Sequence, residues 1–297
     1  MKKVIHLKTL SENLKHINQL LQEANIEDGQ SQAEMLLSYI LGLKRSEIYL
    51  NRQRLLKDIE QKEIDGAIKK MLKNIPLQYI TKRQEFMGID FLIDWGVLIP
   101  RPETEILVEE SIKRLKLKRD ISPLKVLDLG TGSGVIAISL VKFIPSIQVY
   151  AVDISPQSIH LASLNAERSK CQEKIIFLQG NWFDPLKEKV SSESFDAIIS
   201  NPPYISQKDF ATLPAKIKNY EPSIALNGGN KGLKSISKII SQAPYYLKGG
   251  GFLALEIGIK QAIEVKKLIS QKEEFRKEVE IIKDYSRLER VVIAYKK

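Results

Sequence analysis

The feature that most constrains the fold is an apolar segment, Val126–Leu129, that runs into a glycine-rich turn and then into a helical pattern. Glycines in such a turn let the backbone approach a ligand closely at the N-terminus of the helix. The next apolar run ends in Asp153, 19 residues after Gly134. An acidic side chain there can accept hydrogen bonds from both ribose hydroxyls of an adenosine. The sequence therefore predicts an adenosine site, whose turn residues are Gly130, Thr131, Gly132, Ser133 and Gly134.

From Lys125 onward, strand-like apolar runs alternate with helical patterns. This alternation predicts an α/β fold with a doubly wound, mostly parallel sheet. The last two runs are joined by a short link, so we expect them to form an antiparallel hairpin at the edge of that sheet. The expected strands are Val126–Leu129, Gln148–Val152, Ile175–Leu178, Phe195–Ser200, Gly251–Ile257, Val279–Lys283 and Arg290–Ala294.

The N-terminal quarter carries a different pattern, in which apolar residues recur every three or four positions, as on one face of a helix. One such set is Ile59, Ile64, Ile68 and Leu72. Farther along, Gly88 lies between alternating apolar residues, which predicts a β-hairpin. We therefore expect a helical bundle that docks the substrate in residues 1–75, a linker with a β-hairpin in 76–100, and the α/β domain in 101–297.

Composition narrows the possible functions. The 297 residues include 46 Lys+Arg and 36 Asp+Glu, and the resulting charge of +10 is spread along the chain. This excess indicates either a lysine-rich solvated surface or attraction to an acidic or nucleic-acid partner. No apolar run reaches the length of a membrane span, so no membrane partner is expected. With one cysteine, Cys171, and three histidines, we expect a cytoplasmic protein without a metal site.

The spacing of the glycines selects among adenosine ligands. The turn reads Gly-x-Gly-x-Gly, whereas dinucleotide-binding turns read Gly-x-Gly-x-x-Gly. S-Adenosyl-L-methionine is therefore the expected cofactor. Two simpler interpretations stay open at this point. The glycines can serve a tight turn alone, and Trp182, which follows the third strand, can pack either on an adenine face or in the core.

The most informative stretch is Asn201-Pro202-Pro203-Tyr204, which follows the apolar strand Phe195–Ser200 directly. Prolines fix φ and lack an N–H donor, so Asn201 and Pro202 present carbonyl oxygens with little competition. Such acceptors can hold both N–H groups of an amide or an aromatic amine. A rigid loop without chemistry is the alternative interpretation.

These acceptors suit methyl transfer to nitrogen. A planar NH₂ group is a weak nucleophile because its lone pair is delocalised. Two acceptors that favour a pyramidal nitrogen localise the lone pair and aim it in line at a sulfonium methyl group. Carbonyl dipoles also stabilise the positive charge that develops on nitrogen. Asn201 and Pro202 are therefore the predicted catalytic residues, and we expect Tyr204 to stack on the flat acceptor group.

These motifs resemble amino-methyltransferases of the seven-strand S-adenosylmethionine-dependent fold, and more closely the HemK/PrmC family. That family methylates a glutamine side-chain nitrogen in peptide-chain release factors. The resemblance covers nearly the whole chain and implies a Rossmann-like methyltransferase domain preceded by a helical domain and a β-hairpin. Further segments that carry it are Pro76–Ile80, Glu85-Phe86, Leu98–Glu105, Glu221-Pro222 and Ala225-Leu226.

The resemblance also implies roles for single residues. Around the cofactor it places the glycine loop, Asp153, Trp182 and Asn201. Around the glutamine of a Gly-Gly-Gln tip in class-1 release factors it places Asn201, Pro202, Pro203 and Tyr204, with Phe86 and Arg101 on the substrate side. One departure is Asn181, which stands where an Asp commonly precedes the aromatic residue. Its amide oxygen can still accept a hydrogen bond from the amino group of adenine.

Two other functions stay open. DNA adenine and RNA guanine N-methyltransferases share Asn-Pro-Pro-Tyr because the amine geometry is alike, and the basic charge favours them. Against them, Pro100–Glu105 brings more acid than base near the site and no basic-aromatic recognition stretch is present, so no nucleic-acid substrate is expected. The third possibility, a non-catalytic binding protein on a decayed fold, is disfavoured by the intact Asn201, Asp153 and glycine loop.

Overall fold

The computed structural model describes residues 8–118 and 123–297. Residues 1–7 of the expected helical segment lie outside this described part. The chain divides into two compact units, Met1–Lys82 and Arg83–Lys297. The division follows residue 82 rather than 75, because Leu77 packs into the core of the helical unit.

The first unit is built from helices whose apolar faces pack on one another. Thr9 begins the first helix with a capping box, in which Glu12 N donates to Thr9 Oγ1 at 3.2 Å and Thr9 N donates to Glu12 Oε2 at 2.7 Å. Gly42 ends the second helix with a φ of 65°, a left-handed conformation that glycine adopts without strain. The helices are α1 (Leu10–Glu23), α2 (Gly29–Leu41), α3 (Arg45–Leu50), α4 (Asp58–Met71) and α5 (Leu77–Thr81).

The apolar face of α4 is narrower than the sequence pattern predicts. Ile64 and Ile68 are buried, but Ile59 is 66% exposed and Leu72 is 41% exposed. Ile59 lies in the first turn of α4, and Leu72 comes directly after its last residue. The helix ends therefore extend beyond the core that the middle of the helix fills.

The predicted hairpin consists of β1 (Arg83–Phe86) and β2 (Ile89–Leu92). Met87 and Gly88 connect the strands with φ angles of 50° and 73°, the left-handed pair that a two-residue type I′ turn requires. The backbone of Leu92 bonds Asn165 of α8 (Pro156–Arg168) in both directions. Leu92 N donates to Asn165 Oδ1 at 2.7 Å, and Asn165 Nδ2 donates to Leu92 O at 3.0 Å.

Within the described residues, the second unit contains a seven-stranded sheet in the order β5-β4-β3-β6-β7-β9-β8. The first five of these strands are parallel, and β9 runs antiparallel to both β7 and β8. This confirms the predicted mostly parallel sheet with an antiparallel hairpin at one side. Strand order reverses between β3 and β6, and ligands bind such sheets at the C-terminal ends of the strands where the order reverses. The strands are β3 (Leu124–Leu129), β4 (Ile147–Asp153), β5 (Ile175–Gln179), β6 (Phe195–Ser200), β7 (Leu247–Glu256), β8 (Phe275–Lys283) and β9 (Glu289–Lys296).

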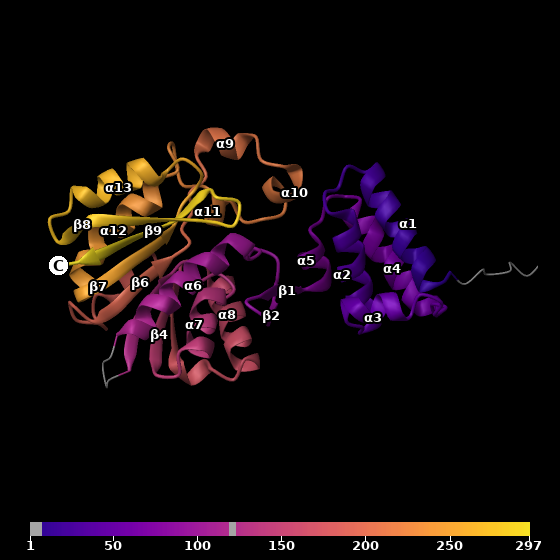
Figure 1. Ribbon diagram of the computed structural model, residues 1–297, viewed down its shortest axis with the longest axis horizontal. Coiled ribbons are helices and arrows are strands. Elements are labelled where there is room, and N and C mark those ends of the chain that lie inside the picture. Colours follow the sequence, from indigo (N-terminus) through magenta and orange to yellow (C-terminus); the bar gives the residue numbers. More distant parts are fainter. Residues whose placement is uncertain (1–7, 119–122) are drawn as a thin grey trace, which may run out of the picture. The chain divides into compact units, whose positions relative to one another are not determined.

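Helices cover both faces of this sheet, α6, α7 and α8 on one face and α12 and α13 on the other (Figure 1). Short helices α9, α10 and α11 connect β6 to α12. Among the helices that the structure describes, none is long and apolar enough to span a bilayer. The remaining bounds are α6 (Pro102–Leu117), α7 (Val135–Phe143), η1 (Gln172–Lys174), η2 (Asp184–Leu186), α9 (Gln207–Ala211), α10 (Ala215–Lys218), α11 (Ser223–Leu226), α12 (Lys234–Tyr246) and α13 (Ala262–Ser270).

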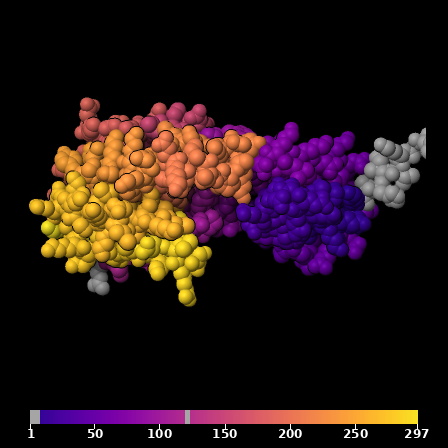
Figure 2. Space-filling view, turned by 90° about the horizontal axis from the view of Figure 1, so that it is seen from above, coloured from indigo at the N-terminus to yellow at the C-terminus, as the bar shows by residue number. Residues whose placement is uncertain are grey.

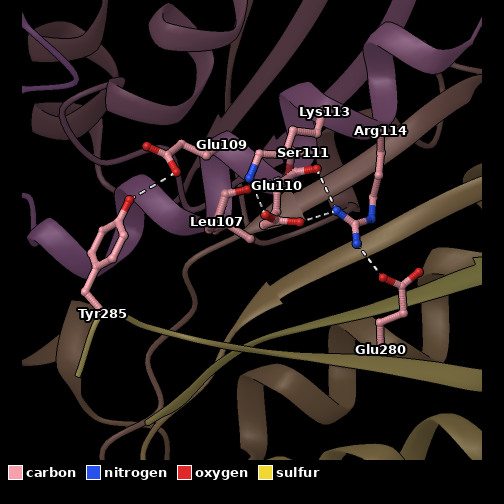
Figure 3. Close-up of polar contacts among 8 residues, drawn as sticks. All are labelled: Leu107, Glu109, Glu110, Ser111, Lys113, Arg114, Glu280 and Tyr285. Atoms are coloured by element: carbon pink, nitrogen blue, oxygen red, sulfur yellow. Dashed lines mark hydrogen bonds and ion pairs between the residues drawn. The ribbon is translucent and has the colours of Figure 1, made fainter. Parts of the chain in front are cut away.

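Polar contacts tie α6 to the C-terminal strands, which form part of the surface of this unit (yellow in Figure 2). Arg114 donates to Glu110, one turn earlier, at 2.5 Å and to Glu280 of β8 (Figure 3). Tyr285, in the link between β8 and β9, donates to Glu109 at 3.4 Å. These contacts hold a helix whose N-terminus borders the candidate active site.

Candidate active site

A cavity of about 620 Å³ lies in the second unit at the C-terminal ends of β3, β4, β5 and β6. Its volume is within the range of sites for small organic ligands. Each strand contributes residues to its wall from the loop that follows the strand. Of the predicted site residues, the lining includes Gly130, Thr131, Gly132, Ser133, Asp153, Trp182, Asn201 and Pro203.

The glycine loop after β3 requires glycine at three positions. Gly130, Gly132 and Gly134 have φ angles of 77°, 57° and 87°, a region that L side chains rarely adopt. A Cβ on Gly134 would also lie 3.1 Å from the Cβ of Ala162 on α8. Gly134 thus serves helix packing, and Gly130 and Gly132 form the wall of the cavity.

The buried carboxyl group of Asp128 holds this loop through a hydrogen bond. Thr131 Oγ1 donates to Asp128 Oδ2 at 2.6 Å. Burial raises the pKa of Asp128 to about 7, because a charged carboxylate loses its hydration there. Asn165 braces the other side, where its Nδ2 donates to Ser133 O at 2.9 Å. The same Asn165 side chain bonds β2, so it links the hairpin to the glycine loop.

Asp153 ends β4 and faces the cavity. Its Oδ2 accepts from Gly132 N and its Oδ1 from Ser155 N, both at 2.9 Å. Burial raises the pKa of this carboxyl group above its usual value. Ser158 and the Ile154 backbone also bond this carboxylate, so a hydroxyl of a ligand in the cavity would share its oxygens with these donors.

The loop after β5 supplies a flat aromatic wall. Trp182 has a φ of 57°, and its ring atom Cζ3 would lie 3.7 Å from a Cβ on Gly130. Asn181 lines the same cavity. An acid, an aromatic ring and a glycine backbone around one cavity suit an adenosine group, with the carboxylate at the ribose and the ring at the base.

The Asn-Pro-Pro-Tyr segment after β6 borders two cavities. Asn201 and Pro203 line the large one. A second cavity of about 120 Å³ is lined by Asn201, Pro202, Tyr204 and Arg101, among others. Asn201 therefore lies where the two cavities adjoin.

Side chains fix both ends of this segment. Asn201 Nδ2 donates to Thr104 Oγ1 at 3.0 Å, and Thr104 Oγ1 donates to Glu256 Oε2 at 2.7 Å. Tyr204 Oη donates to the other carboxylate oxygen, Glu256 Oε1, at 3.0 Å. Burial raises the pKa of Glu256 to about 7 and raises that of Tyr204 above its usual value. The buried carboxyl group of Glu256 thus holds Tyr204 directly and Asn201 through Thr104.

The backbone of the segment is held from behind by a glycine loop and a glutamine. A Cβ on Gly228 would lie 2.7 Å from Pro203 O, and one on Gly232 would lie 2.1 Å from Tyr204 O. Gln261 Nε2 donates to Tyr204 O at 2.9 Å. These close approaches leave the Asn-Pro-Pro-Tyr backbone little room to move.

The two residues expected on the substrate side differ in their placement. Arg101 lines the smaller cavity and donates to Glu221 Oε1 at 2.6 Å. Phe86 is 1% exposed and packs edge-to-face on Phe91, with ring centroids 6.2 Å apart. Phe86 lines neither of these cavities, because its side chain fills the hairpin core instead.

Sequence reasoning missed four residues that position the site: Thr104, Asn165, Glu256 and Gln261. The sequence carries a signal for Glu256 alone, since it is an acid at the end of a fully apolar run, Gly251–Leu255. The other three act through side-chain contacts between residues far apart in the chain, which no local pattern predicts.

Comparisons with known proteins agree with this geometry. A family model described as a methyltransferase domain matches residues 121–291, and one described as the PrmC N-terminal domain matches residues 12–81. A release factor glutamine methyltransferase of Geobacter sulfurreducens is 41% identical over 251 residues, which are 84% of each chain. Another, of Bacillus subtilis, is 36% identical over 290 residues, which are 97% of this chain and 98% of the relative.

A solved structure shares the fold alone. The crystal structure of a methyltransferase from Pyrococcus furiosus matches with a TM-score of 0.51 at 20% identity, covering 78% of this chain and 98% of that one. The two matched domains and the full-length relatives confirm the resemblance that the motifs indicated. The chain is a methyltransferase, and it belongs to the release factor glutamine methyltransferase family.

Proposed function

We propose that this protein transfers a methyl group from S-adenosyl-L-methionine to the side-chain amide nitrogen of the glutamine in the Gly-Gly-Gln motif of class-1 peptide-chain release factors. One observation carries the proposal: Asn201 lies between a cavity of cofactor size and a small cavity lined by Pro202 and Tyr204. The relatives' names support the choice of acceptor.

The residues of the larger cavity fit the methyl donor. The backbone of Gly130–Gly134 approaches it closely, Asp153 accepts hydrogen bonds from the ribose, and Trp182 packs on the adenine. Asn181 offers an amide oxygen to the adenine amino group. When bound, S-adenosyl-L-methionine supplies an electrophilic methyl group on a positively charged sulfur.

The residues of the smaller cavity bind and orient the acceptor. Asn201 and Pro202 accept the two N–H groups of the glutamine amide and favour a pyramidal nitrogen, whose lone pair then points at the methyl group. Their carbonyl dipoles stabilise the charge that develops on nitrogen. Pro203 fixes the loop and Tyr204 packs on the flat amide. Phe86, buried in the hairpin, has no place in this assignment.

The helical unit is proposed to contact the body of the release factor. Its exposed apolar side chains support this role: Leu50 is 83% exposed, Ile59 66% and Leu55 55%. Large apolar side chains exposed to solvent can contribute to a binding surface where they adjoin one another. Replacing Leu50 and Ile59 with serine should raise KM for the intact factor and leave KM for a short Gly-Gly-Gln peptide unchanged. Equal changes in both KM values would refute this docking role.

The reaction is tested with purified protein, labelled S-adenosyl-L-methionine and three acceptors. They are a class-1 release factor, the same factor with its Gly-Gly-Gln glutamine changed to alanine, and bulk DNA plus RNA. We expect label on the intact factor alone. Label on nucleic acid alone would reject the proposal in favour of an exocyclic amine as acceptor, and label on neither would reject the transfer activity itself.

A further inference from the structure

We propose that Glu256, acting through Thr104, sets the direction in which the Asn201 carboxamide faces, and that Glu256 is thereby a positioning residue for the methyl acceptor. The inference rests on the proposed function, since it names the group that orients the amide acceptor site. Glu256 is the last residue of β7. In the sheet, β7 lies two strands away from β3, the strand that the glycine loop follows.

Three side chains form a chain of hydrogen bonds with a defined direction. Asn201 Nδ2 lies 3.0 Å from Thr104 Oγ1, which lies 2.7 Å from Glu256 Oε2. An ionised carboxylate only accepts hydrogen bonds, and a hydroxyl carries a single hydrogen. The Thr104 hydrogen must therefore point at Glu256, and the Thr104 oxygen can only accept from Asn201.

This direction decides which end of the Asn201 carboxamide is available to a ligand. With Nδ2 held by Thr104, the oxygen Oδ1 is presented on the other side of the group. The acceptor site then offers an oxygen to the N–H groups of a glutamine amide. The reversed carboxamide would present N–H groups, which repel those of the substrate. The direction of this relay, the hydrogen bonds from Asn201 through Thr104 to Glu256, is therefore a condition for productive binding.

The same carboxylate also holds the far end of the segment. Tyr204 Oη donates to Glu256 Oε1 at 3.0 Å, so the two oxygens of Glu256 accept from two hydroxyl groups. Glu256 is fully buried, which keeps water from competing for either bond. A neutral, isosteric amide in its place can donate to Thr104, and the Thr104 hydroxyl is then free to donate to Asn201.

Protonation of Glu256 would release the relay in the same way, because a carboxyl group gains an O–H donor. Burial raises the pKa of Glu256 to about 7, and the bonds from Thr104 and Tyr204 oppose that shift. The charges that face this group come from two elements: Arg290 of β9, which favours the ionised form, and Glu103 of α6, which disfavours it. The charges of Arg290 and Arg101 also favour a lower pKa for Tyr204, against the rise that burial causes. Transfer should accordingly fall as the pH drops through about 7.

The first test measures single-turnover transfer to the release factor at saturating methyl donor, from about pH 6 to about pH 9. We expect Glu256→Gln and Thr104→Val to lower the rate about 100-fold, the effect of a misplaced acceptor. Thr104→Ser, which keeps the hydroxyl, should recover most of the rate that Thr104→Val loses. The double variant should be no slower than either single variant, because both break one relay.

Two controls separate positioning from a loss of folding or of cofactor binding. The Kd for S-adenosyl-L-methionine, measured by calorimetry, should stay within about twofold of wild type in Glu256→Gln, since Glu256 lines neither cavity. The fall in rate at low pH should be present in wild type and absent in Thr104→Val. A Kd that weakens as much as the rate, or a pH profile that Thr104→Val leaves unchanged, would overturn the proposal.

A readout without any acceptor keeps the inference separate from the proposed function. With asparagine labelled by ¹⁵N, the side-chain amide signal of Asn201, assigned from its absence in Asn201→Ala, should shift with pH around 7 in wild type. The shift should vanish in Glu256→Gln and in Thr104→Val. If wild type fails to methylate the factor but this titration is present, the proposed substrate is wrong and the relay stands. If the factor is methylated but Asn201 does not respond to pH or to Glu256→Gln, the relay is wrong.

Discussion

Replacing Gly232 with alanine should disable methyl transfer although Gly232 lines neither cavity. Gly232 has a φ of +72°, and a Cβ there would lie 2.1 Å from the carbonyl oxygen of Tyr204 and 2.6 Å from Nε2 of Gln261. The Tyr204 carbonyl must move by about 0.9 Å to reach even a 3.0 Å contact. That movement shifts Tyr204 and its neighbours from the position in which they align the acceptor with the methyl donor.

The expected magnitude has two parts. A misplacement of about 1 Å at an acceptor site lowers kcat about 100-fold. For stability, the left-handed conformation costs alanine about 1–2 kcal/mol, and losing the hydrogen bond between Gln261 and Tyr204 costs about 1 kcal/mol more. A loss of about 2–3 kcal/mol lowers Tm by roughly 4–12 °C in a domain of this size.

Gly250→Ala is the matched control. Gly250 lies in the same unit and has a φ of +71°, but a Cβ there would meet nothing within 4 Å. It should lose about 1–2 kcal/mol of stability and keep the wild-type kcat. The assay is steady-state transfer to a release factor at saturating substrates, with Tm measured on the same samples. A Gly232→Ala enzyme with kcat within twofold of wild type, or equal losses of kcat in both variants, would refute the role of this loop.

Three further changes separate binding, packing and surface effects. Asp153→Ala should weaken S-adenosyl-L-methionine binding about 10- to 100-fold, the value of a hydrogen bond to a charged group, and an unchanged Kd in calorimetry would refute the ribose assignment. Phe86→Ala should lower the free energy of unfolding by about 3–5 kcal/mol but leave KM for a Gly-Gly-Gln peptide unchanged; a raised peptide KM would restore Phe86 to the substrate site. Glu280→Ala should cost less than about 1 kcal/mol in urea unfolding, because its side chain is 45% exposed, and a larger loss would mean that its bond to Arg114 is a main support of α6.

Much of the second unit could be predicted from the sequence because its signals are local. The apolar run Val126–Leu129 ends directly before the glycine loop, Asp153 is the last residue of β4, and β6 ends directly before Asn201. The β1–β2 hairpin was likewise marked by Gly88. The fold therefore followed from periodicity and from the turn residues alone.

The contacts that position the site could not be predicted in the same way. Thr104 and Glu256 are separated by 152 residues in the chain, so no window of sequence holds both. The placement of Phe86 could not be predicted for the same reason, because only its packing on Phe91 shows that the ring turns into the hairpin core. On α4, the periodic pattern placed Ile59 and Leu72 on one apolar helix face, but it could not show where the bundle core ends.

In the proposed function, Asn201 aims a glutamine amide at the methyl group of the donor. Its most direct test is tandem mass spectrometry of the release factor after reaction with wild type and with Asn201→Ala, at equal occupancy by S-adenosyl-L-methionine. We expect one added methyl group on the Gly-Gly-Gln glutamine with wild type and none with Asn201→Ala. A methyl group on another residue, or equal methylation of that glutamine by both enzymes, would contradict it.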